Sequence, residues 1–464
     1  MSAMSRASST YWPAVLAMIL VLCWGGVSLA RDVETSGPGG QEPAATQVDT
    51  GDTAWVLIST ALVMLMTPGL AFFYGGLVRR KNMLSILMQC FMILCLVSLQ
   101  WVLFGYSLSF GPDAGGRGII GGLDWFGLRG VGMAPFRTYS ATVPHQAFMI
   151  FQGMFAVITP ALIIGAFAER MRFSGFCVFS LLWATLVYDP LAHWVWGQGG
   201  FMGLLGGWGA LDFAGGIVVH INAGVSALAA ALVLRKRQGY PNMISPPHNL
   251  PLAVLGAALL WFGWFGFNAG SALGASGVAS GAFVATHIAG ATAGLVWASM
   301  DWFFHKKPTT LGMITGAVAG LAAVTPAAGF VTPIGAVLIG IGAAAFPWLA
   351  VTFLKPRMGY DDSLDAFGVH GIGGIWGVIA TGLFACASLN PAVGRNGLFY
   401  GPDGAAQLLT QLKAVGISAA FSFVACLILL KVVDATIGLR VSEHEERVGL
   451  DLTQHKEAAY TLVD

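Results

Sequence analysis

The sequence predicts an all-α, polytopic membrane protein with eleven transmembrane helices. Of its 464 residues, 56% are hydrophobic and only 10% are charged, whereas soluble domains contain about 25% charged residues. Apolar stretches of about 20 residues, the length that crosses a bilayer, recur along the chain. Gly contributes 63 residues, and small residues let membrane helices pack closely where apolar contact gives little driving force.

The N-terminus is typical of a cleavable signal peptide. Arg6 precedes an apolar stretch over residues 12–27, and the small residues that end at Ala30 suit a cleavage site. We therefore expect residues 1–30 to be removed. Residues 31–51 are rich in Gly, Pro, Thr and acidic residues, which predicts a flexible periplasmic leader. The alternative for the first segment is an additional, uncleaved span.

Eleven apolar segments follow and form the expected membrane domain over residues 52–435. A tail over residues 436–464 remains after the last segment. The expected spans are residues 54–76, 84–107, 145–168, 173–195, 213–234, 251–270, 277–303, 310–327, 331–353, 367–388 and 407–433.

Basic residues are concentrated in every second loop. Because basic loops stay in the cytoplasm, we expect the mature N-terminus outside and the tail inside, with the protein in the cytoplasmic membrane. The net charge of +1 gives no indication of a nucleic-acid partner. The basic residues on the expected cytoplasmic side are Arg79, Arg80, Lys81, Arg170, Arg172, Arg235, Lys236, Arg237, Lys306, Lys307, Lys355 and Arg357.

The odd number of spans in each half indicates two inverted five-helix repeats followed by a final helix. Span 5 begins near Asp212 and contains His220, and its counterpart, span 10, begins near Asp365 and contains His370. At 1.5 Å per residue, His220 lies about 12 Å from the outer entrance and His370 about 8 Å from the inner one. In a hydrocarbon core of about 30 Å both rings approach the centre, where inverted-repeat transporters bind their substrates. The sequence therefore predicts that the two rings meet.

Histidines inside a membrane need a physical explanation. A lone His on an apolar helix is more often a packing residue, but ionisable residues at symmetric positions usually mark a pathway. A pair of buried imidazoles is expected to stay neutral, and each ring then has one donor and one acceptor nitrogen for a small guest. His193 and His287 have no such counterpart, and we interpret them as structural. Asp189 and Asp212 are expected to cap helices. The charge of Asp212 is also expected to favour a cation in the outer vestibule.

Aromatic residues lie near the predicted outer ends of three spans. Such residues usually anchor a helix at the membrane interface. Aromatic faces beside a hydroxyl can alternatively hold a small cation through cation–π attraction and a hydrogen bond. The residues concerned are Phe155, Trp196 and Phe267, with Ser271 close to Phe267.

These segments resemble the ammonium transporter (Amt) family, to which the Rh proteins are related. The likeness runs from about residue 52 to the C-terminus, and only the segment between Trp196 and Asp212 is slightly longer than in some members. The ordered motifs are FQGMFAVITPALIIGAFAERMRFS at 151–174, HWVWG at 193–197, DFAGGIVVHINAG at 212–224, WFGWFGFNAGSAL at 261–273 and FGVHGIGGIWG at 367–377.

The resemblance implies ammonium uptake without enzymatic activity, cofactor or metal. Family members recruit the ammonium ion at an outer aromatic site, remove a proton and conduct ammonia past twin histidines. They are homotrimers with one pore per subunit, and the tail at 439–460 resembles those of members blocked by a cytoplasmic PII-type protein. The implied roles are recruitment by Phe155, Trp196 and Ser271; a gate of Phe155 and Phe267; a pore lined by His220 and His370; an essential acid, Asp212; and further positions of the conduction path, Gln152 and Thr325.

Two alternatives belong to other functional classes. A membrane metalloprotein would use the histidine pair as ligands, but two His residues without nearby Cys, Glu or further His make a poor metal site. An ammonium sensor of the same fold would be expected to append a signalling domain, and the tail of about 30 residues is too short for one.

Overall fold

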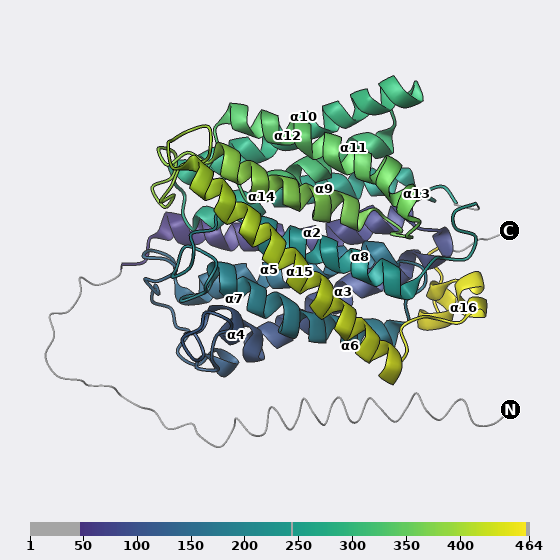
Figure 1. Ribbon diagram of the computed structural model, residues 1–464. Coiled ribbons are helices and arrows are strands. Elements are labelled where there is room, and N and C mark those ends of the chain that lie inside the picture. Colours follow the sequence, from purple (N-terminus) through teal and green to yellow (C-terminus); the bar gives the residue numbers. More distant parts are fainter. Residues whose placement is uncertain (1–46, 243–244, 461–464) are drawn as a thin grey trace, which may run out of the picture. The chain divides into compact units, whose positions relative to one another are not determined.

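The computed structural model describes residues 47–242 and 245–460, and within them it is entirely helical (Figure 1). The expected signal peptide and nearly all of the leader lie outside the described residues. Ten helices are long and apolar enough to cross a membrane, and Thr310–Val324 is a shorter apolar helix. Together they correspond to the eleven predicted spans, so the chain is a multi-pass membrane protein.

The first half supplies spans 1–5. Several spans change from α-helix to a wider π-helical turn, which often marks a functional position. The elements are α2 (Thr50–Leu77), η2 (Arg80–Asn82), α3 (Met83–Gln100), η3 (Trp101–Gly105), α4 (Tyr106–Phe110), η4 (Phe126–Leu128), α5 (His145–Phe167), α6 (Phe173–Trp183), η5 (Ala184–Tyr188), α7 (Asp189–Trp196), η6 (Gly216–Ile221) and α8 (Asn222–Leu234).

The second half repeats this pattern and adds the final span and the tail. Its elements are α9 (Leu250–Ala269), η7 (Gly270–Ala272), α10 (Gly277–His305), α11 (Thr310–Val324), α12 (Pro333–Leu349), η8 (Ala350–Leu354), α13 (Lys355–Met358), η9 (Phe367–Ile372), α14 (Gly373–Phe384), α15 (Gly404–Thr436), α16 (Glu443–Val448) and η10 (Asp451–His455).

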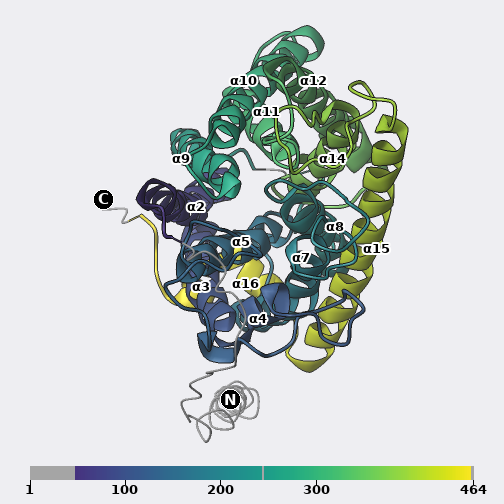
Figure 2. The same ribbon diagram turned by 90° about the vertical axis from the view of Figure 1, so that its left-hand side faces the viewer.

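The two halves meet along symmetry-related helices. The first helices of the two halves, α2 and α9, pack along each other, and the fifth spans cross, with η6 against α14 and η9 against α8. Figure 2 shows α9–α14 gathered on one side and α2–α8 on the other. The helix of the final span, α15, crosses α6, α8 and α14 diagonally (Figure 1). The crossing of spans 5 and 10 therefore lies between the halves, where the candidate site is found.

The expected capping role of Asp189 is wrong. Its carboxylate instead accepts hydrogen bonds from two side chains, Gln100 Nε2 at 2.6 Å and Ser109 Oγ at 3.2 Å. The helix continues through Asp189 from the preceding π-helical turn, so Asp189 does not stand at a helix start. Asp189 thus joins span 4 to span 2 inside the protein.

Candidate functional site

The two histidines from opposite halves lie against each other. The ring centroids of His220 and His370 are 5.3 Å apart and the ring planes differ by 13°. Both side chains are buried, with 1% and 3% exposure. His220 belongs to η6 and His370 to η9, so each ring is presented by a π-helical turn. The structure thus brings the rings together as the depth estimate predicts.

Glycines permit the close crossing of spans 5 and 10. Gly224 and Gly374 each follow a histidine by four residues, one on each span. A Cβ atom on Gly224 would lie 2.0 Å from the backbone nitrogen of Gly371, and one on Gly374 would lie 2.9 Å from the Cβ atom of His220. Because no side chain fits at either contact, the backbones of spans 5 and 10 approach closely enough for the rings to stack.

Asp212 holds the start of the first histidine segment. Its carboxylate accepts hydrogen bonds of 2.6–3.2 Å from the backbone N–H groups of Gly215, Gly216, Ile217 and Val218. These groups have no partners within the helix at its first turn. The capping role expected for Asp212 is therefore observed, and its side chain is 7% exposed.

The counterpart of Asp212 in the second half is Asp362, which the sequence analysis missed. Asp362 precedes His370 by eight residues, the same spacing as between Asp212 and His220, and accepts a hydrogen bond of 2.7 Å from the backbone N–H of Phe367. Burial raises the pKa of Asp362 to about 6. Asp365, which marks the expected entry of span 10 in the sequence, pairs with Lys355 at 2.6 Å. The equal spacing was the signal that identifies Asp362.

Aromatic rings enclose the histidine pair from the side of α9. Trp264 stacks on His220 with centroids 5.6 Å apart, and Phe267 lies 6.0 Å from the same ring. The indole of Trp264 donates a 3.0 Å hydrogen bond to Thr325 Oγ1, so Thr325 positions an aromatic wall. Three ring nitrogens have no hydrogen-bond partner among the described residues: Nδ1 and Nε2 of His220 and Nδ1 of His370. These atoms are available to a guest.

Phe155, Trp196 and Ser271 line one cavity of about 390 Å³, together with Gln152 and Asp212. We call it the outer cavity after the orientation expected from the basic loops. Phe155 is 1% exposed and lies edge-on to Trp196 at 6.0 Å. It is therefore not an interfacial anchor. The indole of Trp196 donates to the carbonyl oxygen of Asp212 at 2.9 Å, and the buried Oε1 of Gln152 has no partner among the described residues.

A pair of phenyl rings separates the outer cavity from an inner one. The centroids of Phe155 and Phe267 are 4.4 Å apart and the planes differ by 43°. Phe155 lines the outer cavity, whereas Phe267 lines an inner cavity of about 540 Å³ that also contains both histidines. Ser271 Oγ donates to the carbonyl oxygen of Phe267 at 2.8 Å. The aromatic pair expected to form a gate thus lies between the two cavities.

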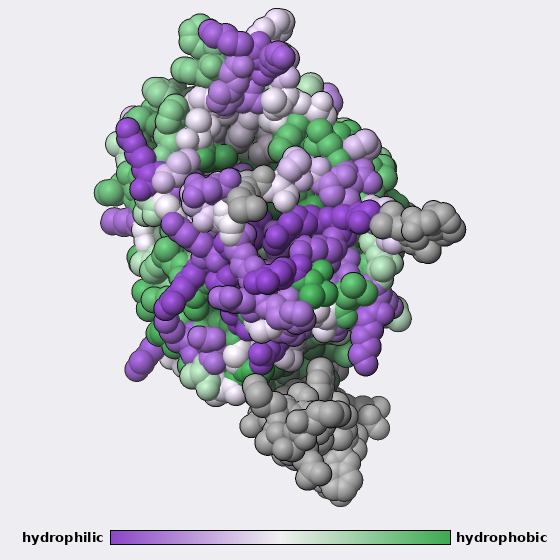
Figure 3. Space-filling view, turned by 90° about the vertical axis from the view of Figure 1, so that its right-hand side faces the viewer, coloured by the Kyte–Doolittle hydropathy of each residue, from purple (hydrophilic) through white to green (hydrophobic). Residues whose placement is uncertain are grey.

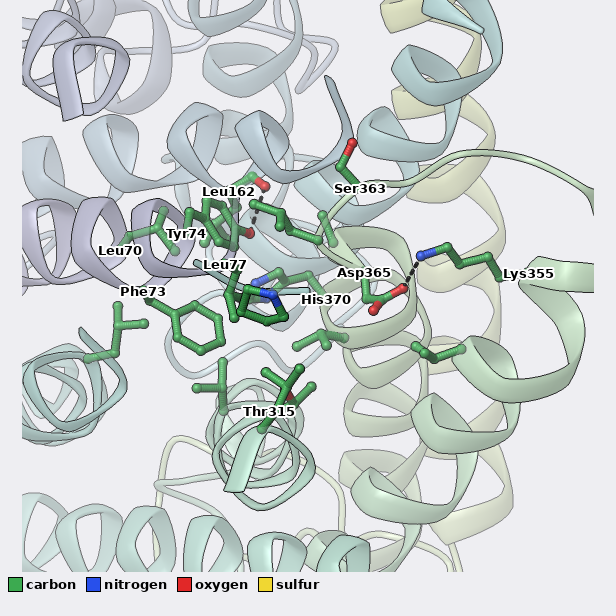
Figure 4. Close-up of a pocket in the computed structure, with 18 of the residues that line it drawn as sticks. Leu70, Phe73, Tyr74, Leu77, Leu162, Thr315, Lys355, Ser363, Asp365 and His370 are labelled. Atoms are coloured by element: carbon green, nitrogen blue, oxygen red, sulfur yellow. Dashed lines mark hydrogen bonds and ion pairs between the residues drawn. The ribbon is translucent and has the colours of Figure 1, made fainter. Parts of the chain in front are cut away.

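The inner cavity is mostly apolar beyond the histidines. Figure 4 shows His370 beside Tyr74 and Leu77, with the ion pair of Lys355 and Asp365 further along the wall. The hydroxyl of Tyr74 donates to the carbonyl oxygen of Leu162 at 3.1 Å. Loops that carry Lys236 and Pro241 border the far end of the cavity.

Charged residues tie the inner loops together. Glu169 accepts hydrogen bonds from Arg79, Asn82 and Arg237 at 2.8–3.0 Å. Burial opposes ionisation of Glu169, but the two guanidinium groups hold its pKa below the ordinary value. Arg237 also pairs with Asp361 at 2.9 Å. The charge of Glu169 therefore fixes the loops after α2, α5 and α8 to one another.

The tail packs against these loops. Arg440 donates 2.7 Å hydrogen bonds to the carbonyl oxygens of Leu234 and Lys236, at the end of the helix that follows His220. Glu446 accepts from Arg440 and from the backbone N–H of Gln238 at 2.9 and 2.7 Å. Carbonyl groups at a helix C-terminus lack partners within the helix and carry negative partial charge, so a guanidinium there is favourable.

The metalloprotein alternative would need ligands in addition to the two histidines. Within residues 47–242 and 245–460, no group of three or more His, Cys, Asp or Glu side chains is arranged to hold a metal ion. The neighbours of the histidine pair are aromatic and aliphatic.

Comparisons with known proteins agree on one family. Residues 54–460 match the model described as Ammonium Transporter Family. The chain is 54% identical to the ammonium transporter of Bacillus subtilis over 410 residues, covering 88% of this chain and 98% of that protein. It is 50% identical to the ammonium transporter Amt1 of Archaeoglobus fulgidus over 412 residues, which is 89% of this chain and 99% of that protein.

Solved structures give the same result. The crystal structure of Saccharomyces cerevisiae Mep2 superposes with a TM-score of 0.79 at 39% identity, covering 86% of this chain and 88% of that one. A protein described as a sensor Amt protein has a TM-score of 0.77 at 28% identity, covering 87% of this chain and 98% of that one.

Proposed function

Because the chain belongs to the ammonium transporter family, we propose that it takes up ammonium across the cytoplasmic membrane and conducts it as ammonia past His220 and His370. The observation that carries this proposal is the stacked, buried imidazole pair, in which three ring nitrogens have no hydrogen-bond partner among the described residues. A metal ion is not needed, and the pair offers hydrogen bonds to a small neutral amine.

Selectivity follows from the cost of dehydration. Ammonium and potassium have the same charge and similar size, so a charged funnel alone would pass both. Leaving water is very costly for an ion that enters an apolar conduit. Ammonium can release a proton and continue as a small neutral molecule, whereas potassium cannot.

The outer cavity is the proposed recruitment site. The faces of Phe155 and Trp196 attract a cation, and Ser271 supplies a hydroxyl oxygen. Asp212 holds Trp196 in place through its carbonyl oxygen and biases the entrance toward a cation. Gln152 adds an unpartnered amide oxygen in the same cavity. The ammonium ion would lose its proton at the phenyl pair before it reaches the histidines.

Replacing Trp196 by Leu tests recruitment. We expect the half-saturating ammonium concentration to rise about tenfold, because a desolvated cation–π contact contributes about 1–2 kcal/mol. The measurement is the concentration dependence of ammonium-driven current in proteoliposomes. Trp208, which is exposed in an outer loop, is the matched control, and Trp208→Leu should leave the value within twofold. An unchanged half-saturating concentration in Trp196→Leu would contradict the recruitment site.

The remaining organisation is also proposed. The mature N-terminus would lie outside, the membrane domain over residues 52–435 would assemble as a homotrimer in the lipid bilayer with one pore per subunit, and the tail over residues 436–464 would lie in the cytoplasm. The basic loops that Glu169 holds together support this orientation.

We further propose that the tail and inner loops bind a cytoplasmic PII-type protein that blocks the pore. Contacts of Arg440 and Glu446 with the loop after α8 support this proposal, because they connect the tail to the helix that follows His220. Sensing is the second candidate, since one structural relative is described as a sensor Amt protein.

Deleting the residues after Arg440 tests the regulatory proposal. We expect inhibition by a PII-type protein to be lost while at least a third of the ammonium uptake remains, because Arg440 still caps the end of α8. Uptake is measured in proteoliposomes with and without the PII-type protein of the same organism. Full inhibition of the truncated chain would refute the assignment of the tail. Separately, normal uptake in cells that lack the protein, together with a lost transcriptional response to ammonium, would favour sensing.

A further inference from the structure

The two cavities of the pore differ in charge. Among the residues that the structure describes, those lining the outer cavity include one acid, Asp212, and no Lys or Arg. Those lining the inner cavity include three basic residues, Lys236, Arg237 and Lys355, and one acid, Asp365. A cation therefore meets a single carboxylate in the outer cavity and mainly basic side chains in the inner one.

Only one of the three inner basic residues lacks an acidic partner in the described part of the chain. Lys355 pairs with Asp365 at 2.6 Å, and Arg237 pairs with Glu169 and Asp361 at 3.0 and 2.9 Å. The ammonium group of Lys236 instead lies 5.9 Å from the centroid of the Tyr240 ring. Its charge is therefore uncompensated at the inner mouth.

The surroundings place this charge at the entrance. Lys236 follows the end of α8 and is exposed, and its Nζ would be 3.7 Å from a Cβ atom built on Gly359 across the cavity. Lys236 thus lies between the loop after α8 and the loop after α13. Figure 3 shows that the end of the molecule where α13 and α16 lie is largely hydrophilic, with depressions between the side chains.

We propose that Lys236 repels ammonium at the inner mouth, so that the transporter binds ammonium more weakly from the cytoplasm than from outside. This inference rests on the proposed function. A passive pore must carry equal fluxes both ways when there is no net driving force. The asymmetry therefore appears as a higher half-saturating concentration inside, with a proportionally higher maximal outward rate. At equal concentration, cytoplasmic ammonium therefore occupies the pore less than external ammonium does.

Coulomb's law sets the size of the effect. For a cation about 8 Å from a unit charge in water, reversing that charge changes the cation's occupancy about fivefold at low ionic strength. At 0.15 M salt the Debye length is also about 8 Å, and the change falls to about twofold. This dependence on salt distinguishes repulsion by an exposed charge from a structural effect of the same substitution.

The test is Lys236→Glu with Arg235→Glu as the matched control. Arg235 is the neighbouring exposed residue and lines neither cavity. Proteoliposomes of a single orientation are obtained through a tag on the tail, and ammonium jumps are applied from either face. In the unaltered protein the inner half-saturating concentration should be several times the outer one. In Lys236→Glu the inner value should fall about fivefold at low salt and about twofold at 0.15 M, with the outer value unchanged.

Four results would overturn the proposal. The first three are equal half-saturating concentrations on both faces of the unaltered protein, no change in Lys236→Glu, and the same change in Arg235→Glu. The fourth is a change in Lys236→Glu that does not depend on salt, since it would indicate an altered loop. If the unaltered protein moves no ammonium from either face, the proposed function fails instead, which separates the two failures.

Discussion

Asp212→Ala is expected to lower ammonium uptake at least a hundredfold. Its carboxylate accepts four backbone hydrogen bonds at the start of η6, and each buried donor left without a partner costs about 1–3 kcal/mol. The segment that carries His220 would have to rearrange. Trp196 would move as well, since its indole donates to the carbonyl oxygen of residue 212. One substitution therefore affects both the recruitment site and the pore.

The measurement is ammonium uptake in proteoliposomes, normalised to the amount of folded protein. Asp212→Asn keeps one acceptor oxygen, so its ammonium uptake should fall less, by about tenfold. Asp124, which is exposed in an outer loop, is the control, and Asp124→Ala should be neutral. Wild-type uptake by a well-folded Asp212→Ala variant would show that neither the cap nor the negative charge is needed.

Removing either imidazole is expected to change what the pore conducts. His220 and His370 are 1% and 3% exposed and stack on each other, so His→Ala leaves a cavity that the neighbouring aromatic rings cannot fill. Water in that cavity would lower the cost of dehydration for ions. We expect the ammonium-driven current of His220→Ala and of His370→Ala to change at least tenfold, and a potassium current to appear.

The design of this experiment uses the coupling of the two rings. Each single variant removes the same contact between the two rings. The double variant should therefore resemble the single variants rather than show twice their effect. His287 contacts Trp261 and Phe265 on an exposed face of α10, and His287→Ala should conduct like the unaltered protein. Identical selectivity and rate in both single variants would remove the histidines from the mechanism.

The number and order of the spans were predictable because hydrophobic length is a strong local signal. The meeting of His220 and His370 was also predictable, since helix rise and inverted topology fix their depth. The role of Asp362 was not predicted. Asp365, which marked the entry of span 10 in the sequence, has a backbone φ of 60° and pairs with Lys355, whereas Asp362 accepts the backbone hydrogen bond at the start of the segment.

Other features depend on tertiary contacts that a single sequence does not encode locally. The π-helical turns at η6 and η9 lie beside the close approach of the two spans at Gly224 and Gly374. Trp264 was missed because an aromatic residue on an apolar helix is usually a packing residue, and only its stacking on His220 distinguishes it. The side-chain partners of Asp189 come from two other helical segments, so its position before Pro190 suggested a cap instead.

The central claim is that the stacked imidazoles line a conduit too apolar for bare cations. Current on solid-supported membranes coated with proteoliposomes of the unaltered protein tests it most directly, with ammonium and potassium pulses of equal concentration. The account predicts a saturable current with ammonium and none above the protein-free background with potassium. A potassium current of similar size would show that intact cations pass the histidine pair and would contradict the account.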